Sequence, residues 1–386
     1  MPGSILVARI LGIDIRIHLS WFLIFGLVVV LLSNPDQGFF AQMRPLWSDE
    51  RIVVVAGVTA ILFFVCIIAH ELAHALVARA FRMPVSSITL FLLGGVANLA
   101  KEPPSARAEF LMAIAGPLMS LLIAGTSFGI SQVVSANLAT FYLLDPVEVV
   151  ATYLAFINVA LAIFNMIPGF PLDGGRVLRS IVWGIARDRA RATRVAARGG
   201  QIVAGLLFVV GIARSFAEGD AFSGMWMALI AYFLYTTASS SLEQERIASS
   251  VAGVQVREVM TTSFQAVGAG MRIRDVVDQH LLPFNARAAA VVDGTRIIGL
   301  VTVADLRKIS QGDWSTISVD SVMTPVRELP EISPGSRLLT AIERFAGGDL
   351  PALPVVDDGR LVGMLERDAV LSYVRMREML GMHRRK

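Results

Sequence analysis

The chain has 386 residues, of which 55% are hydrophobic and only 17% are charged, and its formal net charge is +3. This composition argues against an entirely soluble protein and is typical of a membrane protein with a soluble portion. The small basic excess gives no reason to expect a nucleic-acid partner. The single cysteine, Cys66, lies in an apolar run and excludes an intrachain disulfide framework.

Six stretches come close to the roughly 20 apolar residues that a membrane-spanning helix needs. They are residues 19–35, 52–78, 108–134, 148–168, 198–217 and 221–242. The N-terminus before them alternates apolar and polar residues and lacks the features of a cleaved signal peptide. We therefore expect a polytopic α-helical membrane protein with about six transmembrane helices.

Basic residues are concentrated in alternate loops between these stretches. Residues 173–198 hold seven arginines, whereas residues 134–147 contain neither lysine nor arginine. The positive-inside rule then places the N- and C-termini in the cytoplasm. We expect a multi-pass protein of the cell (inner) membrane.

The second stretch ends in His70-Glu-Leu-Ala-His74, which matches H-E-x-x-H and follows a run without charge from Ile52 to Ala69. On a helix, positions i and i+4 share a face, so both imidazoles can bind one metal, and Glu71 is turned about 100° away. Zn²⁺ suits such ligands. Chance matches are common, but an ionisable residue inside a span costs about 2.5–3.5 kcal/mol, which favours function over a structural role.

A catalytic zinc needs a third protein ligand and one open position. The acids and imidazoles considered are His18, Glu109, Asp145, Asp173, His280 and His383. Asp173 is favoured because it lies at the same membrane depth as the histidines, in the helix-breaking sequence PGFPLDGG of residues 168–175. Irregular backbone at that depth is tolerated only where it lines a cavity or is buried in protein. A plain helix-ending loop with Asp173 as a cap is the alternative.

HELAH, followed later by Asn165-x-x-Pro-x-x-Pro-Leu-Asp173-Gly-Gly-Arg, resembles the site-2 protease family of zinc metalloproteases, which cut other proteins within the membrane. GPLMS, residues 116–120, and FLLGGVANL, residues 91–99, resemble further elements of that family. The resemblance covers residues 1–242, which we expect to form the transmembrane metalloprotease domain.

The family resemblance also implies roles for single residues. His70, His74 and Asp173 would be the zinc ligands, and Glu71 the general base that activates water. Asn165 would lie near the scissile carbonyl and help to hold its developing oxyanion. The implied substrates are membrane-spanning or membrane-associated regulators of the anti-sigma-factor kind, cut in regulated intramembrane proteolysis.

The segment of residues 86–99 is rich in β-forming apolar residues. Its edge could pair with an extended substrate, and two glycines would let the backbones approach closely. We therefore expect Gly94, Gly95 and Asn98 to contact substrate. A loop that only packs the core fits the same residues.

After a polar linker, residues 243–253, the chain contains an internal repeat. AAAVVDGTRIIGLVTVADL recurs as ALPVVDDGRLVGMLERDAV, with an offset of 63 residues at Met260/Met323 and 64 at Gly299/Gly363. Each copy is expected to form a helix, two strands joined by a tight turn, and a second helix. The pair resembles tandem CBS domains, at residues 254–314 and 315–378, followed by a basic tail, residues 379–386.

CBS domains often bind adenine nucleotides through a Gly-h-h-Thr/Ser-x-x-Asp stretch. The first copy keeps this pattern at Thr302 and Asp305, whereas the second has Glu366 and Ala369 at the matching positions. We expect at most one adenine-nucleotide site, at Thr302 and Asp305. Because paired CBS modules often associate again, the resemblance also makes a homodimer plausible.

The prediction is therefore a zinc metalloendopeptidase of the membrane whose activity is tuned by a cytosolic CBS pair. The alternative is a CBS-regulated transporter or channel that uses the His/Glu/Asp cluster as a transport site. Transport sites tend to lie at the midplane between repeated halves, and residues 1–242 show no repeat. A third alternative is a metal-free scaffold protein that only binds partners, in which these histidine and acidic residues would have no function.

Overall fold

The structure is a computed structural model that describes residues 3–36, 38–92, 94–99, 103–137, 142–219, 221–294, 296–346, 350–358 and 360–380. The chain divides into two compact units, Met1–Glu243 and Gln244–Lys386. The division falls inside helix α8 (Ala221–Ser250), so residues 243–250 of the expected linker are helical.

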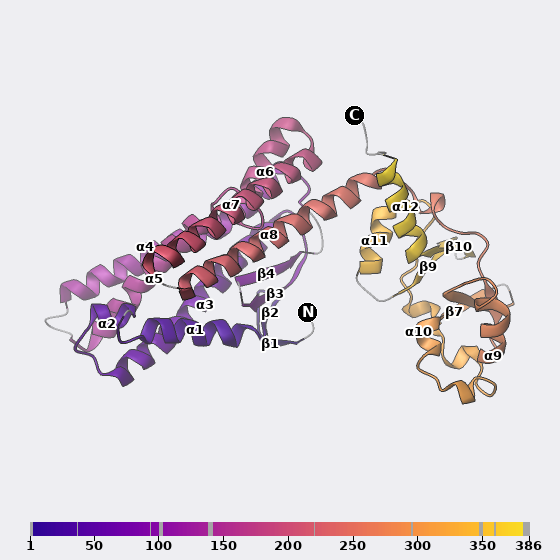
Figure 1. The fold of residues 1–386 in the computed structure, drawn as a ribbon, viewed down its shortest axis with the longest axis horizontal. Helices are drawn as coiled ribbons and strands as arrows, with labels where there is room; N and C mark the ends of the chain where they lie inside the picture. Colours follow the sequence, from indigo (N-terminus) through magenta and orange to yellow (C-terminus); the bar gives the residue numbers. More distant parts are fainter. Residues whose placement is uncertain are drawn as a thin grey trace. The chain divides into compact units, whose positions relative to one another are not determined.

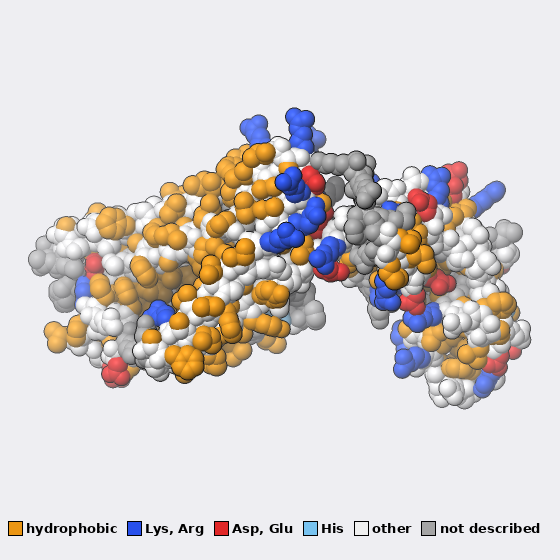
Figure 2. Space-filling view, turned by 45° about the horizontal axis from the view of Figure 1, so that its top comes forward, with side chains coloured by type: hydrophobic (Ala, Val, Ile, Leu, Met, Phe, Trp, Pro, Cys, Tyr) orange, Lys and Arg blue, Asp and Glu red, His pale blue; other side chains and the backbone are white. Residues whose placement is uncertain are grey.

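Within the described residues, five helices have the length and apolar composition to cross a membrane. They are α3 (Asp49–Ala80), α4 (Ala106–Asn137), α5 (Asp145–Asn165), α7 (Arg189–Glu218) and α8. Apolar side chains cover the flanks of these helices, with basic side chains gathered towards one end (Figure 2). The expected polytopic helical fold is confirmed.

The first expected span is shorter than predicted: α1 (Trp21–Ser33) has 13 residues, a length of about 20 Å. The ring of Trp21 lies 4.9 Å from that of Phe64 in α3, and Leu32 packs against Ile52 near the start of α3. Helix α1 is therefore antiparallel to α3 and covers only its first half. A short helix α2 (Phe39–Met43) follows it.

A four-stranded sheet covers the second half of α3. Its order is β1 (Ser4–Ile10), β2 (Ile13–His18), β3 (Val85–Phe91) and β4 (Gly94–Leu99). Strands β1/β2 and β3/β4 are antiparallel hairpins, and β2 pairs with β3 in parallel. Ile13, Ile15 and Ile88 are buried in one cluster with Ala75 and Ala78 of α3. The sheet thus lies beside the part of α3 that carries HELAH (Figure 1).

The segment between α5 and α7 is mostly helical, where the sequence predicted a basic loop. After a loop at residues 166–172, α6 (Asp173–Ala186) begins at Asp173. The carboxylate of Asp188 then accepts a hydrogen bond of 3.0 Å from the backbone N–H of Arg191 and caps α7. Helix α7 therefore begins nine residues before the expected span at 198–217.

In the second unit both copies of the repeat form the expected strand, turn, strand and helix. The elements are β6 (Ala288–Asp293), β7 (Arg296–Thr302) and α10 (Val303–Leu306), then β9 (Ala352–Asp357), β10 (Arg360–Glu366) and α12 (Arg367–Met379). The shorter elements are β5 (Ala266–Gly268), α9 (Ile273–Val276), β8 (Thr324–Pro325) and α11 (Leu338–Ala346).

The two copies exchange their leading segments. Strand β8, at the start of the second copy, pairs with β7 of the first, and Thr261 of the first copy bridges Met364 of the second. Each copy thus completes the sheet of the other, which explains why the repeated Met-Thr pairs stand at equivalent positions.

Candidate metal centre

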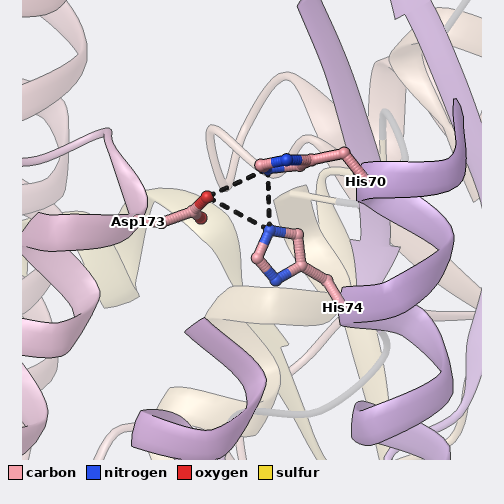
Figure 3. Close-up of side chains that lie close together, drawn as sticks. All are labelled: His70, His74 and Asp173. Atoms are coloured by element: carbon pink, nitrogen blue, oxygen red, sulfur yellow. Dashed lines mark hydrogen bonds and ion pairs between the residues drawn. The ribbon is translucent and has the colours of Figure 1, made fainter. Parts of the chain in front are cut away.

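Two buried histidines face one another one turn apart on α3. His70 is 4% exposed and His74 is 8% exposed. Their Nε2 atoms lie 3.2 Å apart (Figure 3). The i, i+4 spacing on a continuous helix places both rings on one face, as predicted from the sequence.

Asp173, the first residue of α6, completes the group. Its Oδ2 lies 3.1 Å from Nε2 of His70 and 3.2 Å from Nε2 of His74. In a tetrahedral zinc site with bonds of about 2.0–2.1 Å, neighbouring ligand atoms lie about 3.3 Å apart. The three atoms therefore have the spacing of one face of such a site, and they form a group that could hold a metal ion. The carboxylate also lies at the positive end of the α6 dipole.

The other ring nitrogens are held by protein atoms. Nδ1 of His70 lies 2.8 Å from Oγ of Ser120, and Nδ1 of His74 lies 2.6 Å from the carbonyl oxygen of Met112, both on α4. A carbonyl only accepts, so Nδ1 of His74 carries the proton and Nε2 of the neutral ring is a bare lone pair. A cation between this lone pair and the facing carboxylate oxygen stabilises both, and either a metal ion or a proton on Nε2 can supply it. The donor set therefore fits Zn²⁺.

Helix α4 approaches the two rings closely at Gly116. A Cβ atom there would overlap Nε2 of His74 and lie 2.5 Å from Nε2 of His70. The sequence of residues 116–120 indicated only a family element, and the contacts of Ser120 and of the Met112 carbonyl with the histidines were not predicted. A serine in an apolar helix is a visible sign of a polar contact, so Ser120 could have been found from the sequence. A backbone carbonyl could not, because every residue has one.

Glu71 lies against strand β4. A Cβ atom at Gly95 would lie only 2.7 Å from Cγ of Glu71, so the strand backbone packs directly on this side chain. Gly94, at the start of β4, has a φ of +132°. Asn98 pairs with Ser87 of β3 through the backbone, and its side chain lies outside the described part of the structure.

Asn165 ends α5, eight residues before Asp173. Its side-chain amide donates a hydrogen bond of 3.0 Å to the carbonyl oxygen of Leu161 in its own helix. Thus the side chain expected to hold an oxyanion is bonded to its own helix.

The other residues considered as a third ligand have different surroundings. Glu109 pairs with Arg179, Asp145 pairs with Arg44, the His18 ring lies 2.9 Å from Oγ of Ser20, His280 lies in the second unit, and His383 lies outside the described residues. In the part of the chain that the structure describes, His70, His74 and Asp173 are the group with metal-ligand spacing.

In the second unit, Thr302 and Asp305 form the N-terminal cap of α10. Oγ1 of Thr302 donates to Oδ2 of Asp305 at 2.7 Å and accepts from the Asp305 N–H at 3.2 Å. A cleft of about 350 Å³ is lined by residues of both repeat copies. Its charged lining residues are Arg287, Arg307, Glu366, Arg367 and Asp368.

Comparison with known proteins identifies the family. The model of peptidase family M50 matches residues 58–150 and 144–210, and that of the CBS domain matches residues 256–312 and 319–375. A protein of Synechocystis sp. named as a zinc metalloprotease is 31% identical over 374 residues, which are 96% of this chain and 95% of its own. Rip3 of Mycobacterium tuberculosis, also named as a zinc metalloprotease, is 34% identical over 353 residues, 90% of this chain and 86% of its own.

The solved structure of the site-2 protease from Methanocaldococcus jannaschii is 27% identical and covers 62% of this chain and 95% of its own, with a TM-score of 0.42. The full-length relatives favour a peptidase over the transporter that the sequence left open. The chain therefore belongs to the M50, or site-2 protease, family of zinc metalloproteases and carries a C-terminal pair of CBS domains.

Proposed function

We propose that the protein is an intramembrane endopeptidase in which His70, His74 and Asp173 bind one Zn²⁺ and Glu71 is the general base. The observation that carries this proposal is the triangle of Nε2, Nε2 and Oδ2 atoms with sides of 3.1–3.2 Å. When bound, the ion would polarise a peptide carbonyl and lower the pKa of water.

The chain's own residues would orient and protonate the reacting groups. Ser120 and the Met112 carbonyl hold the two rings so that each Nε2 points into the site. Glu71, turned away from the ligand face, would take a proton from the attacking water and pass it to the leaving amine. For Asn165 to hold the oxyanion, its amide would turn from Leu161 towards the substrate carbonyl.

We infer that the substrates are membrane-spanning or membrane-associated regulatory proteins that bind in extended form along β4. A helix hides its carbonyls in internal hydrogen bonds, so the scissile segment must be unwound before it is cut. Strand β4 is an edge strand, with no strand on its outer side among the described residues. Pairing there would bring substrate backbone past Gly94, Gly95 and Asn98, and Gly95 lies against Glu71.

The basic segment that contains α6 and the start of α7 supports a cytoplasmic location for both termini in the cell (inner) membrane. The metal group lies at the start of α6, and we propose that it stands near the cytoplasmic side. Residues 1–242 would be the protease domain, joined at 243–253 to CBS domains at 254–314 and 315–378, and the tail from 379 lies mostly outside the described residues.

The catalytic proposal is tested with purified protein, bound-zinc analysis and a membrane-spanning peptide library. Glu71→Gln should keep stoichiometric zinc and lose cleavage by at least about 100-fold, since general-base catalysis contributes about 10²–10⁴. His74→Ala should lose both zinc and cleavage. Full zinc in His74→Ala, or full cleavage in Glu71→Gln, would contradict the assignment.

For the CBS pair we propose one adenine-nucleotide site at Thr302 and Asp305, which tunes the peptidase, and assembly as a homodimer. The nearby cleft is lined by three arginines and two acids, of which Arg287 and Asp368 pair with one another, and this excess of positive charge supports an anionic ligand. Titration with ATP, ADP and AMP should show binding that Asp305→Ala weakens by at least about tenfold, the loss expected from one charged hydrogen bond. Unchanged binding would remove the site, and unchanged cleavage on saturation would remove the regulatory role.

A further inference from the structure

We propose that helix α7 fixes the third metal ligand: Gly199 and Gly200 are positioning residues that hold the loop before Asp173 in place. This inference rests on the proposed role of Asp173 as a metal ligand. It assigns a function in the metal site to α7, the fourth of the five long apolar helices, which contributes none of the ligands.

The loop and α7 touch backbone to backbone. A Cβ atom at Gly200 would overlap the carbonyl oxygen of Phe170, and one at Gly199 would lie 2.6 Å from the carbonyl oxygen of Pro168. From the loop side, a Cβ atom at Gly169 would lie 2.5 Å from the backbone nitrogen of Gly200. No side chain larger than hydrogen fits between these segments.

Three successive turns of one face of α7 contact the loop. The backbone N–H of Phe170 donates a hydrogen bond of 3.1 Å to the carbonyl oxygen of Ala196. Gly200 follows four residues later, and Ala204, four residues further, is buried in one cluster with Leu172. Because residues four apart share a helix face, α7 supports the loop up to the residue directly before Asp173.

The side of the loop that faces α6 is packed as tightly as the side that faces α7. A Cβ atom at Gly174 would overlap the carbonyl oxygen of Met166, and one at Gly175 would lie 2.5 Å from the nitrogen of Phe170. The loop is therefore held between the first turn of α6 and the glycine pair of α7. A displacement forced from the α7 side must pass to α6 and so to Asp173.

The histidines are held by α3 and by their partners Ser120 and Met112 on α4, and none of these atoms belongs to the loop. A shift of the loop therefore changes the distances from Oδ2 of Asp173 to the two Nε2 atoms while the histidine pair stays in place. Metal–ligand distances tolerate changes of only about 0.2 Å. Crowding at Gly200 should thus weaken metal binding through one ligand of three.

The chain offers matched control glycines on the same helix. Gly205 has no atom within 4 Å of an added Cβ, whereas a Cβ at Gly211 would lie 2.8 Å from Cβ of Met227 on α8. Gly211→Ala therefore crowds α7 against a helix without contacting the loop. If Gly200 mattered only for helix packing, the variants Gly200→Ala and Gly211→Ala would behave alike.

The experiment uses the full-length protein, stripped of metal, in wild-type form and as Gly200→Ala, Gly205→Ala, Gly211→Ala and Asp173→Ala. Zinc affinity is measured by competition with a chromophoric chelator, and ligand geometry by the visible spectrum of the Co²⁺-loaded protein. Gly200→Ala should bind zinc at least about tenfold more weakly, the loss typical when support for a ligand is removed. Its Co²⁺ spectrum should shift towards that of Asp173→Ala, while the two control variants resemble wild type.

Wild-type zinc affinity in Gly200→Ala, or an equal loss in Gly211→Ala, would overturn the inference. Wild-type affinity in Asp173→Ala would instead overturn the proposed ligand set, so the two failures are distinguishable. Unfolding midpoints of all variants show whether each is folded. If Gly200→Ala does not fold, Gly199→Ala tests the same contact at its less crowded position, and the same two readouts decide.

Discussion

The direction of each histidine ring at the metal group is set by the atom bonded to its Nδ1. The Met112 carbonyl fixes the tautomer of His74, and Ser120 holds His70, so both Nε2 atoms face Asp173 in the protein itself. Ligands that are already oriented lose little conformational entropy when a metal binds. Helix α4, which supplies no ligand, therefore contributes to metal affinity.

Substitution of Gly116 tests this contribution. In Gly116→Ala the new methyl would overlap Nε2 of His74, so the ring must rotate and lose its bond to Met112. We expect a loss of zinc affinity of at least about tenfold, measured by chelator competition, with cleavage falling in parallel. Gly125→Ala, on the same helix with no atom within 4 Å of the added methyl, is the control. Equal zinc affinity in both variants would show that α4 does not hold the rings.

The sequence identified the residues of this group by type and spacing, but not what holds them. Two histidines four residues apart and an aspartate in a helix-breaking segment have few other uses in apolar helices. By contrast, the Met112 carbonyl and the contact of Gly95 with Glu71 depend on how α4 and β4 approach α3. Such approaches follow from tertiary packing, which no local pattern encodes.

At the level of elements, α1 is shorter than its hydropathy predicted. Residues 19–35 are apolar enough to span, but strand β2 ends at His18 and helix α1 ends at Ser33. Hydropathy counts apolar residues without showing whether lipid or protein faces them. The alternation of the N-terminal residues served only to exclude a signal peptide, and no strands were predicted there. The parallel pairing of β2 with β3, such as Asp14 with Ser87, is visible only in the fold.

At the end of the helices remote from the metal group, a set of hydrogen bonds joins the segment after α2 to the start of α5. Arg44, directly after α2, donates hydrogen bonds of 2.7 Å to both Asp145 and Glu148 in the first turn of α5. Nε1 of Trp47 also donates to Asp145 at 2.8 Å. The guanidinium is 27% exposed and Glu148 11%, so water screens this pair poorly.

We expect Arg44→Met to destabilise the protein by about 1–3 kcal/mol, because Glu148 loses its cation and Asp145 keeps only the longer ion pair of 3.6 Å with Arg51. The readout is the unfolding midpoint in detergent. Arg9→Met is the matched control: its bond to Asp14 is 2.6 Å long, but Arg9 is 67% exposed and solvated when unpaired. An unfolding midpoint lowered equally in both variants would argue against a specific stabilising role for the bonds from Arg44 to Asp145 and Glu148.

At the scale of the whole molecule, the two units have separate hydrophobic cores. The clusters of the second unit contain residues from 251 onward, and those of the first end at residue 242. The internal repeat predicted two similar modules, and their strands were found where the pattern placed them. The exchange of leading segments was not predictable, because a repeat looks the same whether its copies pack separately or complete one another.

Because β8 of the second copy pairs with β7 of the first, Gly299 lies at the contact between the two copies. In Gly299→Ala the added methyl on β7 would lie 2.5 Å from Sδ of Met323 and 2.8 Å from the carbonyl oxygen of Thr324, both in the second copy. Overpacking of this kind costs about 1–3 kcal/mol, and it should loosen both copies together. Hydrogen exchange should therefore rise in β6, β7, β9 and β10 alike.

Because the cores are separate, the same variant should keep wild-type zinc content and wild-type exchange in α3 to α7. Gly270→Ala, with no atom within 4 Å of its added methyl, controls for the substitution itself. Faster exchange confined to the first copy would contradict the interlocked arrangement. Loss of zinc from Gly299→Ala would instead mean that the stability of the first unit depends on the second.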